Sequence, residues 1–271
     1  MTDYLLIDGD ILVMKAGFAS EESVREEVAG GTIVTRRINP YVDYTRVIDD
    51  ILYRMHQVLP EFKQVIVIGG DGNFRKEINP NYKGNRNPED RPLMYDDCRS
   101  WLVDSHDAIS VDGVETDDVL GMLQCMTKDT TCIASIDKDL LTIPGEHYCI
   151  DKDFHLYVSE EEALYNYCYQ MLTGDPTDNI TGLPGIGPKK AITILGEKGR
   201  PLDAAIGAYE EHIGEDFREY WESTSAMINI LKHPTELPGL IRDDSRVYAL
   251  NTNIENIIKE LGMTCNESSE Q

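Results

Sequence analysis

The chain has 271 residues, which at the usual domain size corresponds to one large domain or two modest ones. Apolar residues make up 41% of it and charged residues 27%, which fits a folded protein and excludes a disordered one. Acidic residues outnumber basic ones by 49 to 25, so the formal net charge is −24. At first sight this charge argues against nucleic acid or an anionic membrane as a partner, unless the carboxylates are gathered to bind metal ions.

The termini and cysteines indicate the compartment. The first 15 residues contain Asp3, Asp8 and Asp10 and no basic segment, which excludes a secretory signal peptide. No run of about 18 apolar residues occurs, so we expect no membrane-spanning helix. The six cysteines are scattered and form no C-x-x-C pair, which is typical of reduced thiols. We therefore expect a cytoplasmic protein without a membrane partner.

Strand and helix patterns alternate over the first two-thirds of the chain. Apolar or β-branched runs predict strands at residues 4–8, 32–37, 65–68, 109–111 and 131–136, and a hairpin over 147–150 and 155–158. Helical spacing of apolar residues predicts helices at residues 11–19, 42–59, 93–103 and 117–126. This alternation predicts an α/β fold in which a mainly parallel, twisted sheet is flanked by helices.

The strand pattern disappears beyond about residue 160. Helical spacing then predicts helices at residues 160–172, 189–195, 202–213 and 217–231. We therefore divide the chain into an α/β domain at residues 1–165 and a helical lobe at residues 166–271. Within the first domain, the polar, Asn- and Pro-rich segment that follows residue 71 predicts a loop or arch region over about residues 72–105.

Carboxylates cluster where the predicted strands end. In parallel sheets ligands bind beyond the carboxyl ends of the strands, so we expect these side chains to converge. Each carboxylate taken singly could instead cap a helix or form a turn. The expectation of a shared site therefore depends on their occurring together at several strand ends. The candidate metal ligands are Asp8, Asp71, Glu115, Asp117, Asp118, Asp137, Asp139, Asp175 and Asp178.

Such a group of carboxylates points to metal chemistry. Convergent carboxylates repel each other and stay ionised together only when cations neutralise them. Oxygen ligands without cysteine favour Mg²⁺ or Mn²⁺. Two such ions about 4 Å apart form a centre that cleaves phosphodiesters. The sequence therefore predicts two divalent ions as cofactors.

Two short segments carry a net positive charge. In Arg75–Arg86, Tyr82 would stack on a base while Lys83 and Arg86 reach a phosphate. In Gly182–Ala191, glycines expose backbone N–H groups before a helix, a geometry that grips a DNA backbone. The first segment could also be a solvated loop, and the second an ordinary turn between helices. The candidate DNA contacts are Arg75, Lys76, Tyr82, Lys83, Arg86, Gly185, Gly187, Lys189 and Lys190.

These segments together resemble the family of flap endonucleases and 5′→3′ exonucleases, which includes the N-terminal nuclease of bacterial DNA polymerase I and bacteriophage 5′ nucleases. The similarity covers about residues 4–200, and the short, acidic chain is most like an exonuclease of a short-tailed bacteriophage. The strings that carry it are Leu6-Ile7-Asp8-Gly9, Tyr82–Arg86, Val114–Asp118, Ser135–Leu140, Gly174–Asn179 and Gly182–Ala191.

The resemblance implies a PIN-like 5′ nuclease core followed by a helix–three-turn–helix duplex clamp at about residues 175–200. Lys83 and Arg86 would stabilise the transferring phosphate, and relatives often bind K⁺ at the clamp turn. The resemblance implies that one ion is held by Asp71, Glu115 and Asp117, with Asp118 as a ligand or a water-mediated partner. The other would be held by Asp137, Asp139 and Asp175, with Asp178 close by, and Asp8 would lie between the two ions, often through water.

One departure from the family concerns the arch. Relatives with a full arch carry a long basic helix after the string that ends at Arg86, whereas Asn87–Pro92 follows here. A short arch favours digestion of duplex DNA from 5′ ends and nicks, together with removal of RNA primers from RNA–DNA hybrids. We expect the protein to act as a monomer, in the host cytoplasm if its source is a phage. The alternatives are a flap-specific endonuclease, a non-catalytic structure-specific DNA-binding protein and a toxin-type ribonuclease of the related PIN class. The last of these lacks the clamp.

Overall fold

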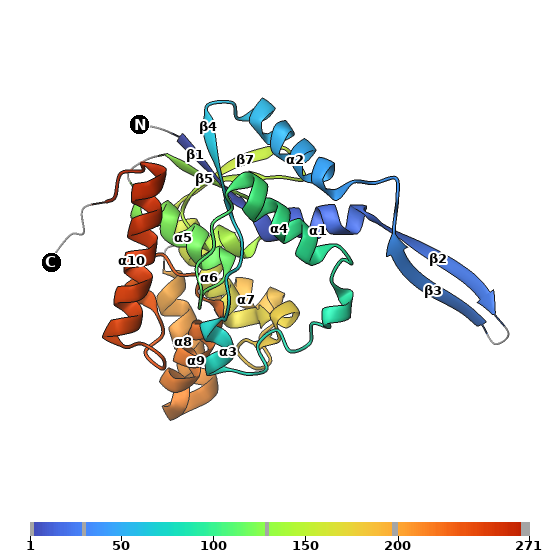
Figure 1. Ribbon diagram of the computed structural model, residues 1–271. Coiled ribbons are helices and arrows are strands. Elements are labelled where there is room, and N and C mark those ends of the chain that lie inside the picture. Colours follow the sequence, from blue (N-terminus) through green and yellow to red (C-terminus); the bar gives the residue numbers. More distant parts are fainter. Residues whose placement is uncertain (1–2, 29–30, 128–129, 197–199, 267–271) are drawn as a thin grey trace.

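The computed structural model describes residues 3–28, 31–127, 130–196 and 200–266 (Figure 1). Its centre is a five-stranded sheet in the order β4-β1-β5-β6-β7. The strands β1 (Asp3–Asp8), β4 (Phe62–Val67), β5 (Thr131–Ser135) and β6 (Gly145–Cys149) are parallel. Only β7 (Phe154–Val158) is antiparallel, as the predicted hairpin requires. The expected mainly parallel sheet is therefore confirmed.

Helices cover both faces of this sheet. Leu5 and Ile7 of β1 pack toward α1 (Gly9–Ala19), α2 (Tyr44–Val58) and α4 (Tyr95–His106). The alternate residues Tyr4 and Leu6 pack instead toward α5 (Thr116–Met126). A strand that is buried on both faces reads as a continuous apolar run, which is why β1 and β4 were recognisable in the sequence.

A separate helical core follows the sheet. The helices α6 (Glu160–Thr173), α7 (Pro188–Leu195), α8 (Pro201–Ile213) and α9 (Phe217–Ile228) surround the buried side chains of Met171, Leu195 and Tyr209. These are the four helices expected beyond residue 160. Helix α9 ends three residues before its predicted end because Asn229 adopts an extended backbone conformation.

The last helix, α10 (Asp244–Leu261), was not expected from the sequence. Asp243 caps it by accepting a hydrogen bond from the Arg246 N–H at 2.8 Å. Its buried residues Leu250 and Ile254 belong to the same core as α5, so the chain returns to the α/β part after α9 (Figure 1). The division of the chain at residue 165 stays a prediction.

The strand predicted at residues 32–37 is confirmed, whereas the one predicted at residues 109–111 needs correction. Residues 32–37 lie in β3 (Gly31–Ile38), which pairs with the unexpected strand β2 (Glu21–Val28) in a ribbon that projects from the body (Figure 1). Because both faces of the ribbon are solvated, β2 shows no apolar alternation that would reveal it. Residues 109–111 form only a single bridge, between Ile109 and Val67.

Short elements complete the arch region and the connections. Helix α3 (Phe74–Ile78) precedes a polar segment of turns that contains the 3₁₀ helix Pro88–Asp90. Arg36 of the ribbon donates to the Arg91 carbonyl at 2.6 Å. The remaining elements are β8 (Gly174–Asp175), β9 (Ile180–Thr181) and 3₁₀ turns at Asp139–Thr142, Pro176–Asp178, Gly214–Asp216 and Pro234–Glu236. Among the described residues, no helix has the length and apolar character needed to cross a bilayer.

Candidate active site

Asp8 lies where β1 ends and α1 begins. Its carboxylate accepts hydrogen bonds from the Ile11 N–H at 3.3 Å and from Ser135 Oγ, at the end of β5, at 2.7 Å. The residue is only 3% exposed, and this burial raises the pKa of Asp8 to about 7. The Ser135 hydrogen bond opposes the rise, whereas the charges of Asp10 and Asp137 add to it.

Asp117 and Asp137 extend this group from α5 and from the loop after β5. Burial raises the pKa of Asp117 well above its usual range, and the nearby charges of Asp8 and Asp137 raise it further. Asp137 is positioned by its backbone N–H, which donates to Ser135 Oγ at 3.0 Å. The parallel strands β1 and β5 and the start of α5 thus bring these three carboxylates near one another.

Asp139 and Asp175 form the outer end of the same group. Gln170 of α6 donates to Asp139 Oδ1 at 2.7 Å, and Asp139 N–H donates to Asp137 Oδ1 at 2.9 Å. Burial, followed by the charges of Asp137 and Asp175, raises the pKa of Asp139 to about 7. The helical lobe therefore contributes to the site through Gln170 and Asp175.

We call Asp8, Asp117, Asp137, Asp139 and Asp175 the crowded carboxylates. Among the residues that the structure describes, none of the five takes part in an ion pair within 4.0 Å. No three acidic, histidine or cysteine side chains of the described chain form a closed metal-binding arrangement. The group supplies close, hard oxygen donors whose mutual repulsion a divalent cation would relieve, and it forms no finished coordination shell.

Glu115 precedes α5 and faces cations. Lys83 Nζ contacts Glu115 Oε1, while Arg75 Nη1 lies 3.1 Å and Tyr82 Oη 2.7 Å from Glu115 Oε2. Although burial opposes it, the charges of Arg75 and then Lys83 lower the pKa of Glu115 to about 2. Glu115 is therefore ionised at neutral pH, whereas burial and like charge raise the pKa values of Asp8, Asp117 and Asp139.

Asp178 belongs to the same cationic side of the site. Its carboxylate contacts Arg86, lies 3.5 Å from Lys83 Nζ and lies 3.2 Å from Tyr82 Oη. The backbone N–H of Lys83 also donates to the Asp178 carbonyl at 2.9 Å. Lys83 adopts a positive φ of 55°, an uncommon backbone conformation that often marks functional sites.

Asp118 has a different role from its neighbour Asp117, which corrects its assignment as a metal ligand. Arg75 donates to both of its oxygens, at 2.7 and 2.9 Å, and the Glu115 and Leu231 N–H groups donate at 3.1 and 3.0 Å. The carboxylate is fully buried, and each oxygen already accepts two hydrogen bonds. It has no free position for a metal ion.

Two predicted DNA contacts also need correction. Arg75 is 2% exposed and Tyr82 is 3% exposed, so neither presents a surface to DNA. Arg75 instead neutralises Asp118 and Glu115, and Tyr82 donates its hydroxyl to the carboxylates that surround it. The aromatic and basic segment lies beside Glu115, and two of its side chains are buried there. Lys76 and Arg86 are exposed.

Asp71 follows β4, the strand that pairs with β1. Its backbone N–H donates to Asp112 Oδ1 at 2.8 Å and its carbonyl accepts from the Gly113 N–H at 2.8 Å. The residue is exposed, and it stays a predicted ligand.

The predicted DNA clamp lies between α6 and α7. Gly185 has a φ of +77°, and Gly185, Gly187, Lys189 and Lys190 are all exposed. Pro188 is the first residue of α7, and Lys190 Nζ donates to the Gly185 carbonyl at 2.9 Å. The N-terminus of α7 therefore faces solvent with two lysines beside it. Residues 197–199 of the predicted clamp lie outside the described residues.

Sequence reasoning missed three residues that position the site. Asp10 accepts hydrogen bonds from Thr116 Oγ1 at 2.6 Å and from Arg99 at 3.2 Å, which join α1, α4 and α5 beside Asp8. Ser135 and Gln170 orient crowded carboxylates, as described above. Asp10 was visible as the second acid of Asp8-Gly9-Asp10, whereas the other two carry no signal in the sequence.

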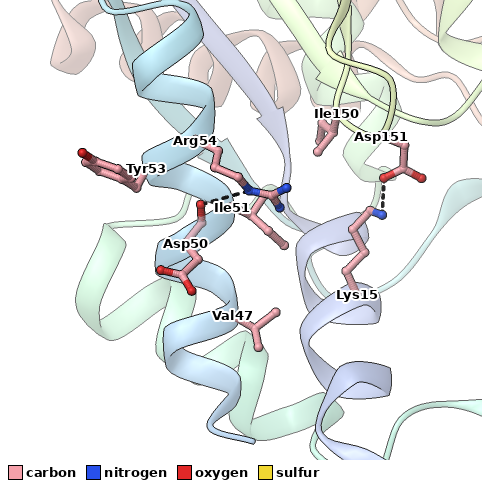
Figure 2. A pocket seen from close by; sticks show the side chains of 8 residues that line it. All are labelled: Lys15, Val47, Asp50, Ile51, Tyr53, Arg54, Ile150 and Asp151. Carbon is pink, nitrogen blue, oxygen red and sulfur yellow. Dashed lines mark hydrogen bonds and ion pairs between the residues drawn. The ribbon is translucent and has the colours of Figure 1, made fainter.

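A separate cavity lies away from the carboxylates, between α1, α2 and the loop after β6 (Figure 2). It has a volume of about 630 Å³. Lys15 reaches across it to Asp151, and Arg54 stands beside Ile51 (Figure 2). None of the candidate ligands lines this cavity.

The sequence matches the family described as "5′-3′ exonuclease, N-terminal resolvase-like domain" over residues 3–168. Similar proteins include the flap endonuclease Xni of Vibrio atlanticus, 31% identical over 176 residues that cover 56% of this chain and 68% of that protein. The exodeoxyribonuclease of Enterobacteria phage T3 is 28% identical and covers 68% and 63%, respectively. DNA polymerase I of Bacillus caldotenax is 25% identical over 79% of this chain, which spans only 25% of that polymerase.

Solved structures show the same fold. A bacteriophage T5 5′-exonuclease with bound divalent zinc ions has a TM-score of 0.55 and 15% identity, covering 94% of this chain and 99% of that chain. A T5 flap endonuclease in a pseudo-enzyme–product complex with DNA and metal ions has a TM-score of 0.57 and 14% identity, covering 95% and 99%. At this identity the likeness concerns the fold alone.

Proposed function

Because the chain belongs to the 5′-3′ exonuclease family with a resolvase-like N-terminal domain, we propose that it is a metal-dependent nuclease that degrades duplex DNA from 5′ ends and nicks. One observation carries this proposal. Five carboxylates from two strand ends, one helix and the helical lobe crowd together, and two cations, Lys83 and Arg86, lie at the edge of the group. Crowded carboxylates beside cations suit the hydrolysis of a phosphodiester.

The donor set fits Mg²⁺ or Mn²⁺. Burial and like charge raise the pKa values of Asp8, Asp117 and Asp139. A hard divalent cation bound among them would lower these pKa values again. We propose that the crowded carboxylates hold two such ions, with Glu115 and Asp178 at the border. Bound ions would polarise the scissile phosphate and activate water.

Lys83 and Arg86 would bind the phosphate. In the described structure both cations are engaged with Glu115 and Asp178. A scissile phosphate could replace these carboxylates as the partner, because an ammonium and a guanidinium recognise both kinds of anion. The two side chains would then stabilise the charge that develops on the transferring phosphoryl group.

The segment of about residues 175–200 would hold the duplex. Exposed backbone N–H groups at the N-terminus of α7, with Lys189 and Lys190, suit a helix–three-turn–helix clamp on a DNA backbone, with K⁺ at its turn. Such contacts do not read bases. They allow a monomer to act on DNA duplexes and on RNA–DNA hybrids, as in primer removal.

The arch region bears on the choice between end digestion and flap cutting. Between α3 and α4 the chain forms turns and one 3₁₀ helix but no longer helix, which supports the loop-like arch expected from the sequence. We therefore place exonuclease activity first. The second candidate is a flap endonuclease, which the likeness to the flap endonuclease Xni of Vibrio atlanticus favours.

The deciding experiment is a cleavage series with 5′-labelled blunt, nicked and flapped duplexes and an RNA–DNA hybrid in Mg²⁺. We expect mononucleotides or short oligomers from nicked and blunt ends. Release of intact flaps without digestion of ends would establish the second candidate. The absence of cleavage in both Mg²⁺ and Mn²⁺, with duplex binding retained, would overturn the proposed nuclease.

A further inference from the structure

Arg75 makes five hydrogen bonds to two separate parts of the chain, although it is only 2% exposed. Its guanidinium donates to Asp118 and Glu115 at α5, as described above. Nε also donates to the Met227 carbonyl at 3.0 Å, and Nη2 donates to the Asn229 carbonyl at 2.7 Å. A buried arginine with all of these hydrogen bonds does more than neutralise charge, because it holds the start of α5 and the end of α9 in a fixed relative position.

The two oxygens of Glu115 are held in different ways. Oε2 is held by Arg75 and by Tyr82, both of which are buried. Oε1 is held by Lys83, whose side chain is 19% exposed and which stands at the edge of the crowded carboxylates. If Lys83 exchanged Glu115 for a phosphate, Oε1 would lose its partner while Arg75 and Tyr82 would still hold Oε2. Glu115 would therefore keep its orientation.

The carbonyl partners of Arg75 belong to the helical lobe. Met227 is in the last turn of α9, and the next residue, Ile228, packs into the core formed by α6, α7 and α8. That core also holds Ile186 and Ala191 of the proposed clamp. A displacement of the lobe therefore moves two of the acceptors that set the position of the Arg75 guanidinium.

We propose that Arg75 is a positioning residue that orients Glu115 and couples it to the helical lobe. Duplex DNA bound by the lobe would then tighten metal binding at the carboxylates, and metal would tighten duplex binding by the same factor. The inference rests on the proposed nuclease function, since it gives Glu115 a part in the metal site. It assigns Arg75 no contact with DNA or with the reacting atoms.

The test compares Arg75→Lys and Tyr82→Phe with the wild type. Lysine keeps the charge but cannot form the planar fork, and phenylalanine removes only the hydroxyl that shares Glu115 Oε2 with Arg75. For both variants we expect the half-saturating Mg²⁺ concentration to rise, or kcat to fall, about 10–100-fold, as with other residues that orient a ligand. KM for nicked duplex should stay within about twofold, because neither residue touches DNA.

A destabilised control separates positioning from stability. Ile254→Ala removes a buried side chain of α10 that contacts neither Arg75 nor the carboxylates, and it should lower Tm without moving the Mg²⁺ dependence. If Arg75→Lys behaves like this control, its role is structural only and the proposal is wrong. Should Arg75→Lys fail to fold, Tyr82→Phe decides, because an unchanged Mg²⁺ dependence there contradicts the proposal equally.

Calorimetry with Ca²⁺ tests the link to the lobe. In the wild type, nicked duplex should increase Ca²⁺ affinity about fivefold or more, and in Arg75→Lys this gain should disappear. Equal gains in both proteins would overturn the coupling. A wild type that cleaves no DNA in Mg²⁺ or Mn²⁺ would refute the proposed nuclease instead, and Ca²⁺ affinity with and without duplex would still report on the Arg75 link.

Discussion

The two sides of the carboxylate site differ in what neutralises them. Glu115, Asp118 and Asp178, which we call the ion-paired carboxylates, face cations that the chain itself supplies. The crowded carboxylates face mainly one another, and burial with mutual repulsion raises the pKa values of three of them. A carboxylate with a partner inside the chain can serve the fold, whereas one among like charges is suited to an external cation.

Asp117 and Asp118 show this difference within one turn of α5. They are adjacent and chemically identical, yet Asp118 accepts four hydrogen bonds in the core while the neighbours of Asp117 are other carboxylates. Successive residues of a helix point about 100° apart, so one faces Arg75 and the other faces the site. The pair provides a sharp internal control for the predictions below.

The largest effect is expected on catalysis. Asp117→Asn and Asp137→Asn each remove a charge from the crowded carboxylates, and we expect kcat/KM on nicked duplex in Mg²⁺ to fall roughly 1,000-fold, about 4 kcal/mol of transition-state stabilisation. Asp104→Asn, an exposed substitution on α4, is the matched control and should leave the rate unchanged. A wild-type rate in Asp137→Asn would show that the crowded carboxylates do not hold the metals.

The next effect is on the free energy of unfolding, and here we expect the ion-paired Asp118 to matter more than the crowded Asp117. Asp118→Asn leaves the buried Arg75 without its bidentate partner, so the free energy of unfolding should fall by about 3–5 kcal/mol. Asp117→Asn relieves repulsion and should leave the metal-free protein equally or more stable. Chemical denaturation in EDTA measures both. Equal losses in the two variants would remove the distinction between the two sides.

A smaller effect is expected from metal binding. Mg²⁺ at about 100 times its dissociation constant should stabilise the wild type by about 2.7 kcal/mol, because it binds only the folded chain. The gain should be largely lost in Asp137→Asn, and it should persist in Asp104→Asn. Thermal unfolding with and without Mg²⁺ measures it. If Asp137→Asn gains as much as the wild type, the ions are bound elsewhere.

The smallest effect concerns the clamp. Lys189→Ala combined with Lys190→Ala should reduce the slope of log affinity against log salt by up to about 2, since each lysine would neutralise one phosphate. The control is Arg54→Ala, which removes a cation from the cavity of Figure 2, away from the clamp. Duplex binding in Ca²⁺ over a range of salt concentrations measures both slopes. An unchanged slope in the lysine variant argues against the clamp.

Much of the fold followed from local patterns. The strands β1, β4 and β5 are continuous apolar runs because both faces of the sheet are covered, and the hairpin of β6 and β7 follows its turn. The strand β2 of the ribbon and the helix α10 were not predicted. The ribbon buries no face that would impose an alternation of apolar and polar residues. Helix α10 is stabilised by packing on α5, which lies far away in the sequence.

The amino-acid order by itself indicated a set of candidate carboxylates, because the carboxyl ends of neighbouring parallel strands lie at the same edge of the sheet. Only the tertiary structure decided which charges are already neutralised. Arg75 and Tyr82 look like surface residues in a polar loop, yet α5 and α9 enclose them and turn them toward Glu115. Charge compensation depends on distances between segments more than 30 residues apart, which no local pattern encodes.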